Sequence, residues 1–310
     1  MLVRAPRALF ALVLAIALIG HGLALSVRPA AAADSSTRRS SSVRARSTAP
    51  KRTVARKKAR PAPPGGVWSR QAVLIDPESG EVLFSKNSRE VVPIASLSKL
   101  MTAIVFLEDK PDLDRTVVVT REDWRGAGKT HLDVGERVRL GDLLHMSLMC
   151  SDNCATRVLA RESGLEGEDF IVRMNRRALE MGLQRTRFVE PTGLSERNVA
   201  SAEDVARLLV TAARIPTVRE IMTTRVHQFR TARKPHSVPN TNRLLYGRLE
   251  VRGGKTGYIS EAGYCFATWV RSQGRDLVAV VLGAPTPATR FADVVRLVRR
   301  SAPGLAANRG

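Results

Sequence analysis

Three short motifs contain residues whose types and spacing fit nucleophilic catalysis. The first is Ser96-Leu97-Ser98-Lys99, at the head of a stretch with apolar residues at helical spacing. Residues three apart lie on one face of a helix, so the Ser96 hydroxyl and the Lys99 amine can touch. A lysine with a lowered pKa can remove the serine proton, and a helix N-terminus favours a developing oxyanion. Taken alone, such a pair is usually only a helix start followed by a solvated charge.

The other two motifs supply hydroxyl, amide and cationic groups. Ser151-Asp152-Asn153 follows an apolar run, and its hydroxyl and amide could pass a proton to a leaving amine and hold a peptide carbonyl. A helix break with capping side chains is the alternative interpretation. Lys255-Thr256-Gly257 follows Gly253-Gly254 and precedes the strand-like Tyr258. A cation and a hydroxyl on an edge strand suit a carboxylate, and the glycines let two backbones approach each other.

Several other chemistries do not fit the sequence. A phosphate-binding loop needs a glycine five positions before the glycine of Gly-Lys-Thr, where the chain's two such sequences have Asp123 and Leu249. No Gly-x-Ser-x-Gly elbow occurs, which disfavours a Ser-His-Asp hydrolase. The metal-ligand spacings His-x-x-x-His and His-x-His are absent among His131, His145, His227 and His236. We therefore expect neither a metal nor a cofactor.

The elements that must position these motifs follow from hydrophobic periodicity. Strands are predicted at 72–75 and 82–84 around a turn at 76–80, and again at 264–270 and 277–282. Helices are predicted from about 97 to 107 and over 141–163, 167–182, 201–214 and 288–300. Strands at both ends of a helical middle predict an α+β fold whose sheet pairs N- and C-terminal strands.

The charge of the chain is concentrated near its start. The 310 residues include 50 Lys and Arg against 29 Asp and Glu, a formal net charge of +21. Residues 1–70 hold 14 of these basic residues and a single acidic residue, Asp34. The excess of positive charge therefore lies mostly outside the folded part. With three Trp and three Tyr, the chain also has few aromatic residues on which bases could stack. We expect no nucleic acid as a partner.

The leading segment has the composition of an export signal followed by a linker. Arg4 and Arg7 precede an apolar run, and small residues at 30–33 offer a cleavage site, so we interpret 1–33 as a signal peptide. An uncleaved anchor is the alternative. Residues 34–66 are rich in Ser, Arg and Pro and are predicted to be a disordered basic linker, which either contacts an anionic envelope surface or is a plain spacer.

From Val67 to about Arg300 the sequence resembles the serine D-Ala-D-Ala peptidases, the low-molecular-mass penicillin-binding proteins. The three motifs occur in the order and form known for that group. Longer matches are Pro93–Ala103, Arg187–Ser195 and Asn240-Thr241-Asn242. Within the family the chain is most similar to the short penicillin-binding protein 7 type, a D-alanyl-D-alanine endopeptidase. The domain boundaries that follow are a catalytic domain over 67–303 and a tail over 304–310.

The resemblance implies an acyl transfer at peptidoglycan stem peptides and cross-links, in an exported, periplasmic protein that is soluble after signal cleavage. Ser96 would attack the carbonyl of a D-Ala residue, with Lys99 as the base, and Ser151 would relay a proton to the departing amine. Water would then hydrolyse the acyl-enzyme, and a β-lactam would trap it as an acylating inhibitor. The implied fold is an antiparallel sheet flanked by helices beside a helical lobe that carries the second motif.

The resemblance also implies a set of substrate-binding residues. Asn153 would hold the acyl side chain, and Lys255 and Thr256 would bind the substrate carboxylate on a strand that continues through Gly257. The backbone N–H groups of Tyr258 and of the nucleophile would form the oxyanion hole. Longer carboxypeptidases of this superfamily continue into a β-domain and an anchoring helix. Because no such extension follows here, we expect cleavage of D-Ala to diaminopimelate cross-links, with trimming of terminal D-Ala as the alternative.

Two other functions are disfavoured by the sequence. A class A-like β-lactamase would need a Glu-x-x-Leu-Asn stretch, which does not occur, and a non-catalytic envelope-binding protein would lack a catalytic residue. Of the cysteines Cys150, Cys154 and Cys265, two could pair in an oxidising compartment, but buried free thiols are the favoured interpretation. Glu190 and Asp152 are assigned structural roles. The oligomeric state and any regulators stay open.

Overall fold

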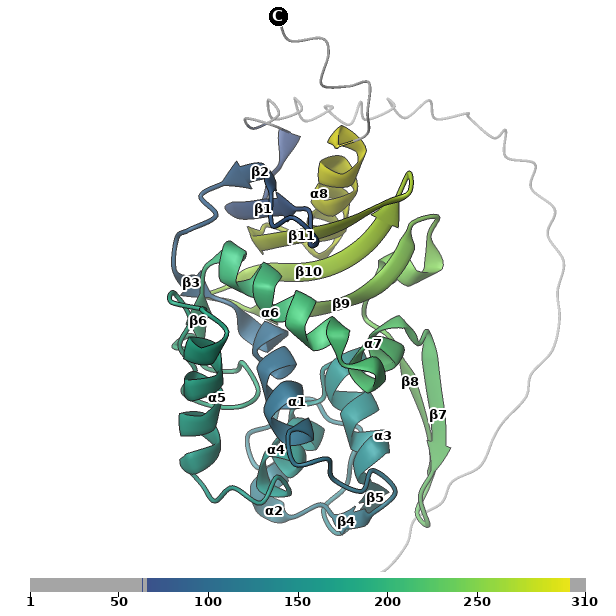
Figure 1. The fold of residues 1–310 in the computed structure, drawn as a ribbon. Coiled ribbons are helices and arrows are strands. Elements are labelled where there is room, and N and C mark those ends of the chain that lie inside the picture. The colour runs from purple at the N-terminus through teal and green to yellow at the C-terminus, as the bar shows by residue number, and fades with distance from the viewer. Residues whose placement is uncertain (1–62, 64–65, 302–310) are drawn as a thin grey trace, which may run out of the picture. The chain divides into compact units, whose positions relative to one another are not determined.

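A computed structural model describes residues 63 and 66–301 of the chain, and its central feature is a five-stranded antiparallel sheet (Figure 1). The strand order is β2-β1-β11-β10-β9, so strands from the two ends of the sequence pair in the middle. This confirms the predicted α+β architecture. The bounds of the strands, in sheet order, are Val82–Lys86, Gln71–Ile75, Arg275–Ala284, Gly263–Ser272 and Glu250–Ile259.

The sheet is buried on both faces, which explains why β1 and β11 each contain an uninterrupted apolar run. In β1, Val73 faces the core shared with the helical lobe, whereas Leu74 faces the core under α8 (Pro287–Arg300). Because successive side chains of a strand point to opposite faces of the sheet, neighbouring residues of β1 pack into two separate cores. Helix α6 (Ala202–Arg214) covers the first face and α8 covers the second (Figure 1).

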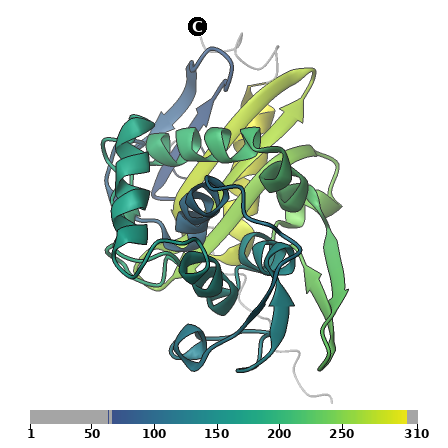
Figure 2. The ribbon, with the colours of Figure 1, turned by 60° about the horizontal axis from the view of Figure 1, so that its bottom comes forward.

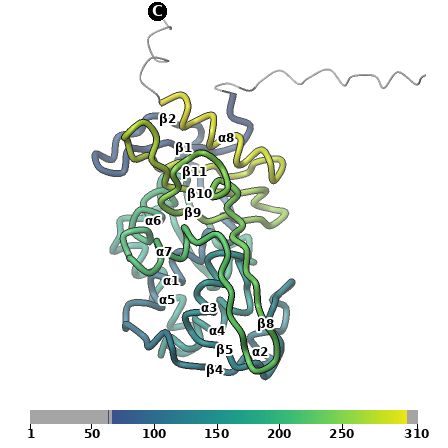
Figure 3. Tube along the Cα trace, turned by 90° about the vertical axis from the view of Figure 1, so that its right-hand side faces the viewer, coloured from purple at the N-terminus to yellow at the C-terminus, as the bar shows by residue number. Residues whose placement is uncertain are grey.

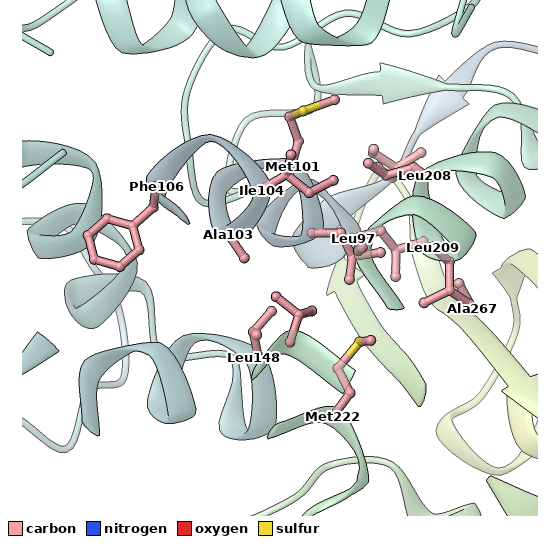
Figure 4. Packing of buried hydrophobic residues seen from close by; sticks show 14 of the residues in the cluster. Leu97, Met101, Ala103, Ile104, Phe106, Leu148, Leu208, Leu209, Met222 and Ala267 are labelled. Carbon is pink, nitrogen blue, oxygen red and sulfur yellow. The ribbon is translucent and has the colours of Figure 1, made fainter. Parts of the chain in front are cut away.

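The helical lobe is built around α1 (Lys99–Leu107), of which residues 99–106 are all buried. A helix that is apolar on every side belongs in the centre of a lobe. Figure 4 shows Leu97, Met101 and Ile104 of this region packed among side chains of α6, α7 and the segment before residue 150. Helices α4 (Asn153–Arg161), α5 (Asp169–Glu180) and α6 pack against α1. The other helices of this part, seen in Figure 2, are α2 (Arg121–Trp124), α3 (Leu140–His145) and α7 (Pro216–Thr223).

Three small two-stranded sheets complete the described part. The hairpin of β7 (Val226–Arg230) and β8 (Pro235–Pro239) runs along the helical lobe, as Figure 3 shows. The other pairs and the short helical turns are β3 (Val92–Pro93) with β6 (Val199–Ala200), β4 (Thr116–Val118) with β5 (Arg137–Arg139), η2 (Ala95–Ser98), η3 (Met146–Cys150) and η4 (Arg243–Tyr246).

Two differences from the predicted elements lie close to the three motifs. The helical pattern expected over 141–163 is not one helix, and the alternative of a helix break with capping side chains is what the structure has: α3 passes into the π-helical turn η3, the chain leaves the helix at Ser151 with φ of 65°, and α4 begins at Asn153. The reason is that the Asp152 carboxylate accepts a hydrogen bond from the N–H of Ala155 and so starts a new helix. Helix α7 and the β7–β8 hairpin were not expected at all.

The predicted signal peptide, linker and C-terminal tail lie outside the described residues, apart from Pro63 and Gly66 of the linker. The predicted catalytic domain coincides with most of the described part. Among the described residues, no helix has both the length and the apolarity needed to cross a bilayer.

Candidate active site

The structure brings the three motifs together around the start of α1. The Nζ atom of Lys99 lies 3.1 Å from the Oγ atom of Ser96, as the one-turn spacing predicts. Ser96 is half-buried, while the Lys99 side chain is completely buried. A serine hydroxyl that faces the solvent side of a buried amine has the arrangement of a nucleophile with its base.

The turn that presents Ser96 is held tightly by backbone packing. Ala95 has φ of 50°, and its carbonyl accepts a hydrogen bond from the Ser98 hydroxyl at 3.0 Å. Two glycines press against this turn: a Cβ at Gly193 would lie 2.0 Å from the Ala95 oxygen, and one at Gly257 would lie 3.1 Å from the Ser96 nitrogen. Only glycine lets the Arg187–Ser195 segment and the third motif approach the nucleophile this closely.

Lys99 has an environment that favours its neutral form. Burial lowers the pKa of the Lys99 amine from 10.5 to about 7, although the carboxylates of Glu190 and Asp152 partly oppose this shift. The amine donates to Asn153 Oδ1 at 2.6 Å and to the Thr192 carbonyl. A neutral amine has two hydrogens and one lone pair. With both hydrogens engaged, the lone pair is left for the Ser96 hydroxyl.

The second and third motifs contact each other across the site. The Nζ atom of Lys255 donates to Ser151 Oγ at 2.8 Å and to the Thr256 carbonyl at 2.9 Å. Lys255 is 1% exposed, and burial together with the nearby charge of Lys99 holds the pKa of its amine well below the ordinary lysine value. Because Lys255 already donates to it, the Ser151 hydroxyl can direct its own hydrogen elsewhere.

Asn153 and Asp152 fix the second motif to the loop before it. Asn153 Nδ2 donates to the Ala127 carbonyl at 2.9 Å, which uses one of its two hydrogens. The Asp152 carboxylate accepts from the Thr130 hydroxyl and from the His131 backbone N–H, each at 2.9 Å. Asp152 is buried and has the structural role that was assigned to it. The Gly128-Lys129-Thr130 sequence therefore anchors a loop.

The third motif is supported from two sides. The Thr256 hydroxyl lies 2.7 Å from the Thr241 hydroxyl, and Arg290 of α8 donates to the Gly257 carbonyl at 3.1 Å. The Nε atom of Arg290 is buried without a hydrogen-bond partner among the described residues. The Tyr258 side chain is half-exposed and stacks on Tyr264 with 4.3 Å between ring centroids. Arg290 thus adds positive charge behind the strand of the third motif.

Glu190 is engaged in organising its own loop. Its two carboxylate oxygens accept from the backbone N–H of Thr192 at 2.7 Å, that of Gly193 at 2.5 Å and the Asn198 amide at 3.0 Å. These donors shape the loop so that the Thr192 carbonyl points at Lys99. With its lone pairs used in this way, Glu190 is a structural residue and not a base for water.

All three cysteines are free, as favoured from the sequence, and Cys154 and Cys265 are buried. Burial raises the pKa of the Cys150 and Cys154 thiols to about 12 and that of Cys265 to about 11. The described residues include no group of three or more His, Cys, Asp and Glu side chains arranged to hold a metal.

We predict that these thiols react very slowly in the native protein. A pKa raised from 9 to about 12 lowers the thiolate fraction at pH 8 by about 10³-fold, and the thiolate is the reactive form. Titration with a disulfide reagent should reveal three thiols per chain in denaturant and fewer than one, on a timescale of minutes, without it. Rapid reaction of two thiols in the folded protein would contradict the burial described above.

Several contacts of the site were not foreseen. The Thr192 and Ala127 carbonyls are backbone groups, which a side-chain motif does not reveal. Gly193 lies in the Arg187–Ser195 segment noted above, but its packing against Ala95 depends on the tertiary structure. Arg290 carries no local signal, because an arginine near the start of a helix is unremarkable in a sequence.

Comparison with known proteins gives matches over most of the chain. Residues 57–286 match the D-alanyl-D-alanine carboxypeptidase family. A D-alanyl-D-alanine endopeptidase of Pseudomonas aeruginosa is 36% identical over 237 residues, which cover 74% of this chain and 76% of that protein. The endopeptidase of Escherichia coli is 33% identical over the same shares.

Solved structures agree with the fold. A DD-transpeptidase from Streptomyces superposes with a TM-score of 0.72 at 25% identity, over 75% of this chain and 96% of that one. The penicillin-binding protein D2 of Listeria monocytogenes, in a cefotaxime-bound form, gives 0.67 at 30% identity over the same shares. Both are built on the α+β arrangement described above.

Proposed function

Since this chain belongs to the D-alanyl-D-alanine carboxypeptidase family and is a serine D,D-peptidase, we propose that it is a D-alanyl-D-alanine endopeptidase that opens peptidoglycan cross-links. The proposed mechanism rests on one observation. The Lys99 amine, whose pKa is lowered to about 7, lies 3.1 Å from the Ser96 hydroxyl. The endopeptidase preference is supported by the two endopeptidases that align over 76% of their lengths.

In the proposed acylation, Ser96 Oγ attacks the carbonyl carbon of D-Ala while its proton passes to Lys99. The backbone N–H groups of Ser96 and Tyr258 donate to the oxyanion. As the C–N bond breaks, the Ser151 hydroxyl gives its proton to the departing amine, and Lys255 replaces that proton through the 2.8 Å contact. The products of this step are the released amine and a Ser96 ester.

Deacylation returns each proton to its starting place. A water molecule gives a proton to Lys255 through Ser151 and attacks the ester carbonyl, and Lys99 reprotonates the departing Ser96 oxygen. A lysine with a lowered pKa can both accept and release a proton near neutral pH. A β-lactam forms the same ester with Ser96 but keeps its amine attached, so it acylates and inhibits the enzyme.

Substrate binding uses the groups that remain free for it. The second Nδ2 hydrogen of Asn153 donates to the peptide carbonyl of the acyl side, and Lys255 with Thr256 binds the carboxylate of the leaving side. The substrate carboxylate places a negative charge beside Lys255. An opposite charge favours the protonated form of the lysine. Arg290, behind the strand, contributes to the same positive field.

Acylation should depend on pH through Lys99. Because the base acts in its neutral form and its pKa is about 7, the acylation rate constant should be half-maximal near pH 7. Below that pH it should fall about tenfold per unit, and above it the constant should reach a plateau. The measurement is the rate of covalent labelling of Ser96 by a fluorescent penicillin from pH 5 to 9. A rate unchanged from pH 5 to 8 would contradict the assignment of Lys99 as the base.

The function is tested with the purified chain on a cross-linked muropeptide dimer and on a free pentapeptide, followed by mass spectrometry. We expect release of monomers from the dimer and no release when Ser96→Ala replaces the enzyme. Loss of terminal D-Ala alone would make the protein a carboxypeptidase. Cleavage of neither substrate would refute the proposed reaction.

A β-lactamase is not favoured, because that reaction needs a carboxylate that activates water. The Glu190 carboxylate already accepts hydrogen bonds from Thr192, Gly193 and Asn198. For the leading residues we propose a cleaved export signal and a periplasmic location, and we propose that the basic linker contacts anionic envelope polymers. Secretion of a fusion to the first 66 residues, and salt-dependent binding of that linker to cell walls, test these two proposals.

A further inference from the structure

Four aromatic rings form a column between the helical lobe and the β7–β8 hairpin. His145 of α3 stacks on His227 of β7 with 3.8 Å between ring centroids and 15° between planes. His227 stacks on Phe229 at 5.5 Å, and Phe229 stacks on His236 of β8 at 4.5 Å. Three of the chain's five histidines are thus gathered in one contact that the proposed reaction does not use.

Carboxylates of the lobe hold the histidines of the hairpin. His227 Nε2 lies 2.8 Å from Asp142, and His236 Nε2 lies 2.8 Å from Glu136, a residue with no exposed surface. Glu136 also accepts from the Thr231 hydroxyl at the hairpin's end. The hairpin is therefore attached to the lobe through these titratable rings together with Val238 of β8, which is buried in the core.

The hairpin leads directly to the substrate side of the site. Immediately after β8, Asn240 Nδ2 donates to the Thr224 carbonyl at 2.9 Å. The next residue, Thr241, donates from its backbone N–H and its hydroxyl to the Met149 carbonyl, and its hydroxyl lies 2.7 Å from that of Thr256. Thr241 thus joins the segment before Ser151 to the carboxylate-binding strand.

The stacked pair has one clear place for an added proton. His145 Nδ1 lies 2.7 Å from the Gly141 carbonyl and so carries a hydrogen, which leaves Nε2 to take up a proton in acid. A charge on His145 would face the stacked His227 ring, whose Nε2 atom contacts the Asp142 carboxylate. Burial lowers the pKa of His145 from 6.5, and the hydrogen bond to Gly141 only partly opposes this.

The other charged groups around the column differ in their effects. Asp142 on α3 and Glu220 on α7 favour a charged His145, whereas His227 opposes it. Asp142 is also paired with Arg139, so its charge is shared. At the far end, Glu136 faces His236 and lies 3.9 Å from Lys234, which pairs with Asp133. Among the described residues, His145 and His227 are the only two imidazole rings that stack directly on each other.

We propose that the His145–His227 stack is a pH-sensitive contact that holds the β7–β8 hairpin against the lobe and thereby positions Thr241 beside Thr256. When the hairpin is docked, His145 binds a proton less readily than when it is released. Docking is therefore strongest above about pH 6.5 and weakens as the pH falls below that value. His145 and His227 act as positioning residues.

The test compares the wild-type chain with His145→Phe, which keeps a stacked ring that cannot be charged, and with His227→Gln, which keeps a donor toward Asp142. His131→Gln is the matched control, because the His131 side chain is exposed and lies outside the column. Amide exchange of residues 226–239 is followed by mass spectrometry at pH 7.5 and 5.0, corrected for the intrinsic rate. The thermal midpoint is measured under the same two conditions.

We expect hairpin exchange in the wild type and in His131→Gln to accelerate at least tenfold at pH 5.0, with little change in the sheet. In His145→Phe and His227→Gln this acceleration should disappear, and the acid-induced drop in midpoint should be smaller by about 2–4 °C. Equal acceleration in all four proteins, or acceleration spread evenly over the chain, would overturn the proposal.

A kinetic readout separates this effect from the protonation of Lys99. Lys99 should lower kcat in acid in all four proteins, whereas release of the hairpin should raise KM about tenfold in the wild type and the control only. This part of the test rests on the proposed function. If no protein cleaves the peptides, the function fails, and the exchange experiment still decides whether the histidine contact is pH-sensitive. An unchanged KM in the wild type at pH 5.0 would refute the link from hairpin to site.

Discussion

Replacing Lys99 by Met is expected to lower the rate of Ser96 acylation by about 10²–10⁴-fold, the range that a positioned general base contributes. Met matches the length and unbranched shape of the lysine stem, and the site is already fully buried, so the fold should persist. The loss comes from the missing lone pair beside the Ser96 hydroxyl. The Thr192 carbonyl and Asn153 Oδ1 also lose their donor, which should cost about 1–3 kcal/mol of the free energy of unfolding.

A second variant distinguishes a base from a mere positive charge. Lys99→Arg keeps a cation, but a guanidinium is not deprotonated at any accessible pH. If Lys99 acts as a base, the arginine variant should be as slow as the methionine variant, and its residual rate should not rise from pH 6 to 8. The measurement is penicillin labelling followed by intact mass, with circular dichroism to verify folding. Labelling by Lys99→Met within tenfold of the wild-type rate would refute the assignment.

The contact between the proposed nucleophile and its base could be predicted from the sequence, because it depends on local spacing. One helical turn separates Ser96 from Lys99, and this spacing alone places the two side chains in contact. The strands β1 and β11 were also predictable, since a strand buried on both faces is a short continuous apolar run. These features need no knowledge of which segments meet in space. Their confirmation, together with the family assignment, is what supports the fold and the reaction type.

The features that were missed, or expected only as an alternative, depend on groups with a weak signature in the local sequence. The break at Ser151 interrupts a pattern that remains apolar and helical through residue 149, and only the Asp152 cap marks it. The half-buried positions on β7 are His227 and Phe229, so aromatic rings stand where aliphatic side chains are usual in a strand. Aromatic stacking supports the β7–β8 hairpin where an alternating aliphatic pattern is usual. Propensity and periodicity are therefore weak guides in this segment.

Replacing Gly193 by Ala is expected to be the most damaging single-methyl change in the site. A Cβ there would lie 2.0 Å from the Ala95 oxygen and 2.7 Å from the Ser96 nitrogen. Both are backbone atoms, so no side chain can rotate away, and either the loop or the η2 turn must move. We expect a loss of roughly 3 kcal/mol or more in the free energy of unfolding. A displacement of Ser96 by about 1 Å should slow acylation by about 10²-fold or more.

Gly164→Ala is the matched control for the backbone conformation of Gly193. Gly164 has φ of +80°, almost the same as the +82° of Gly193, but a Cβ at that position meets nothing within 4 Å. Its substitution should cost only the left-handed strain, about 1–2 kcal/mol, and leave acylation unchanged. Urea unfolding and penicillin labelling of both variants therefore separate strain from the clash. Because the Gly193 loop also presents the Thr192 carbonyl to Lys99, the clash should displace the nucleophile and its base together. Equal effects of the two substitutions on labelling would show that close packing of this loop does not hold Ser96 in place.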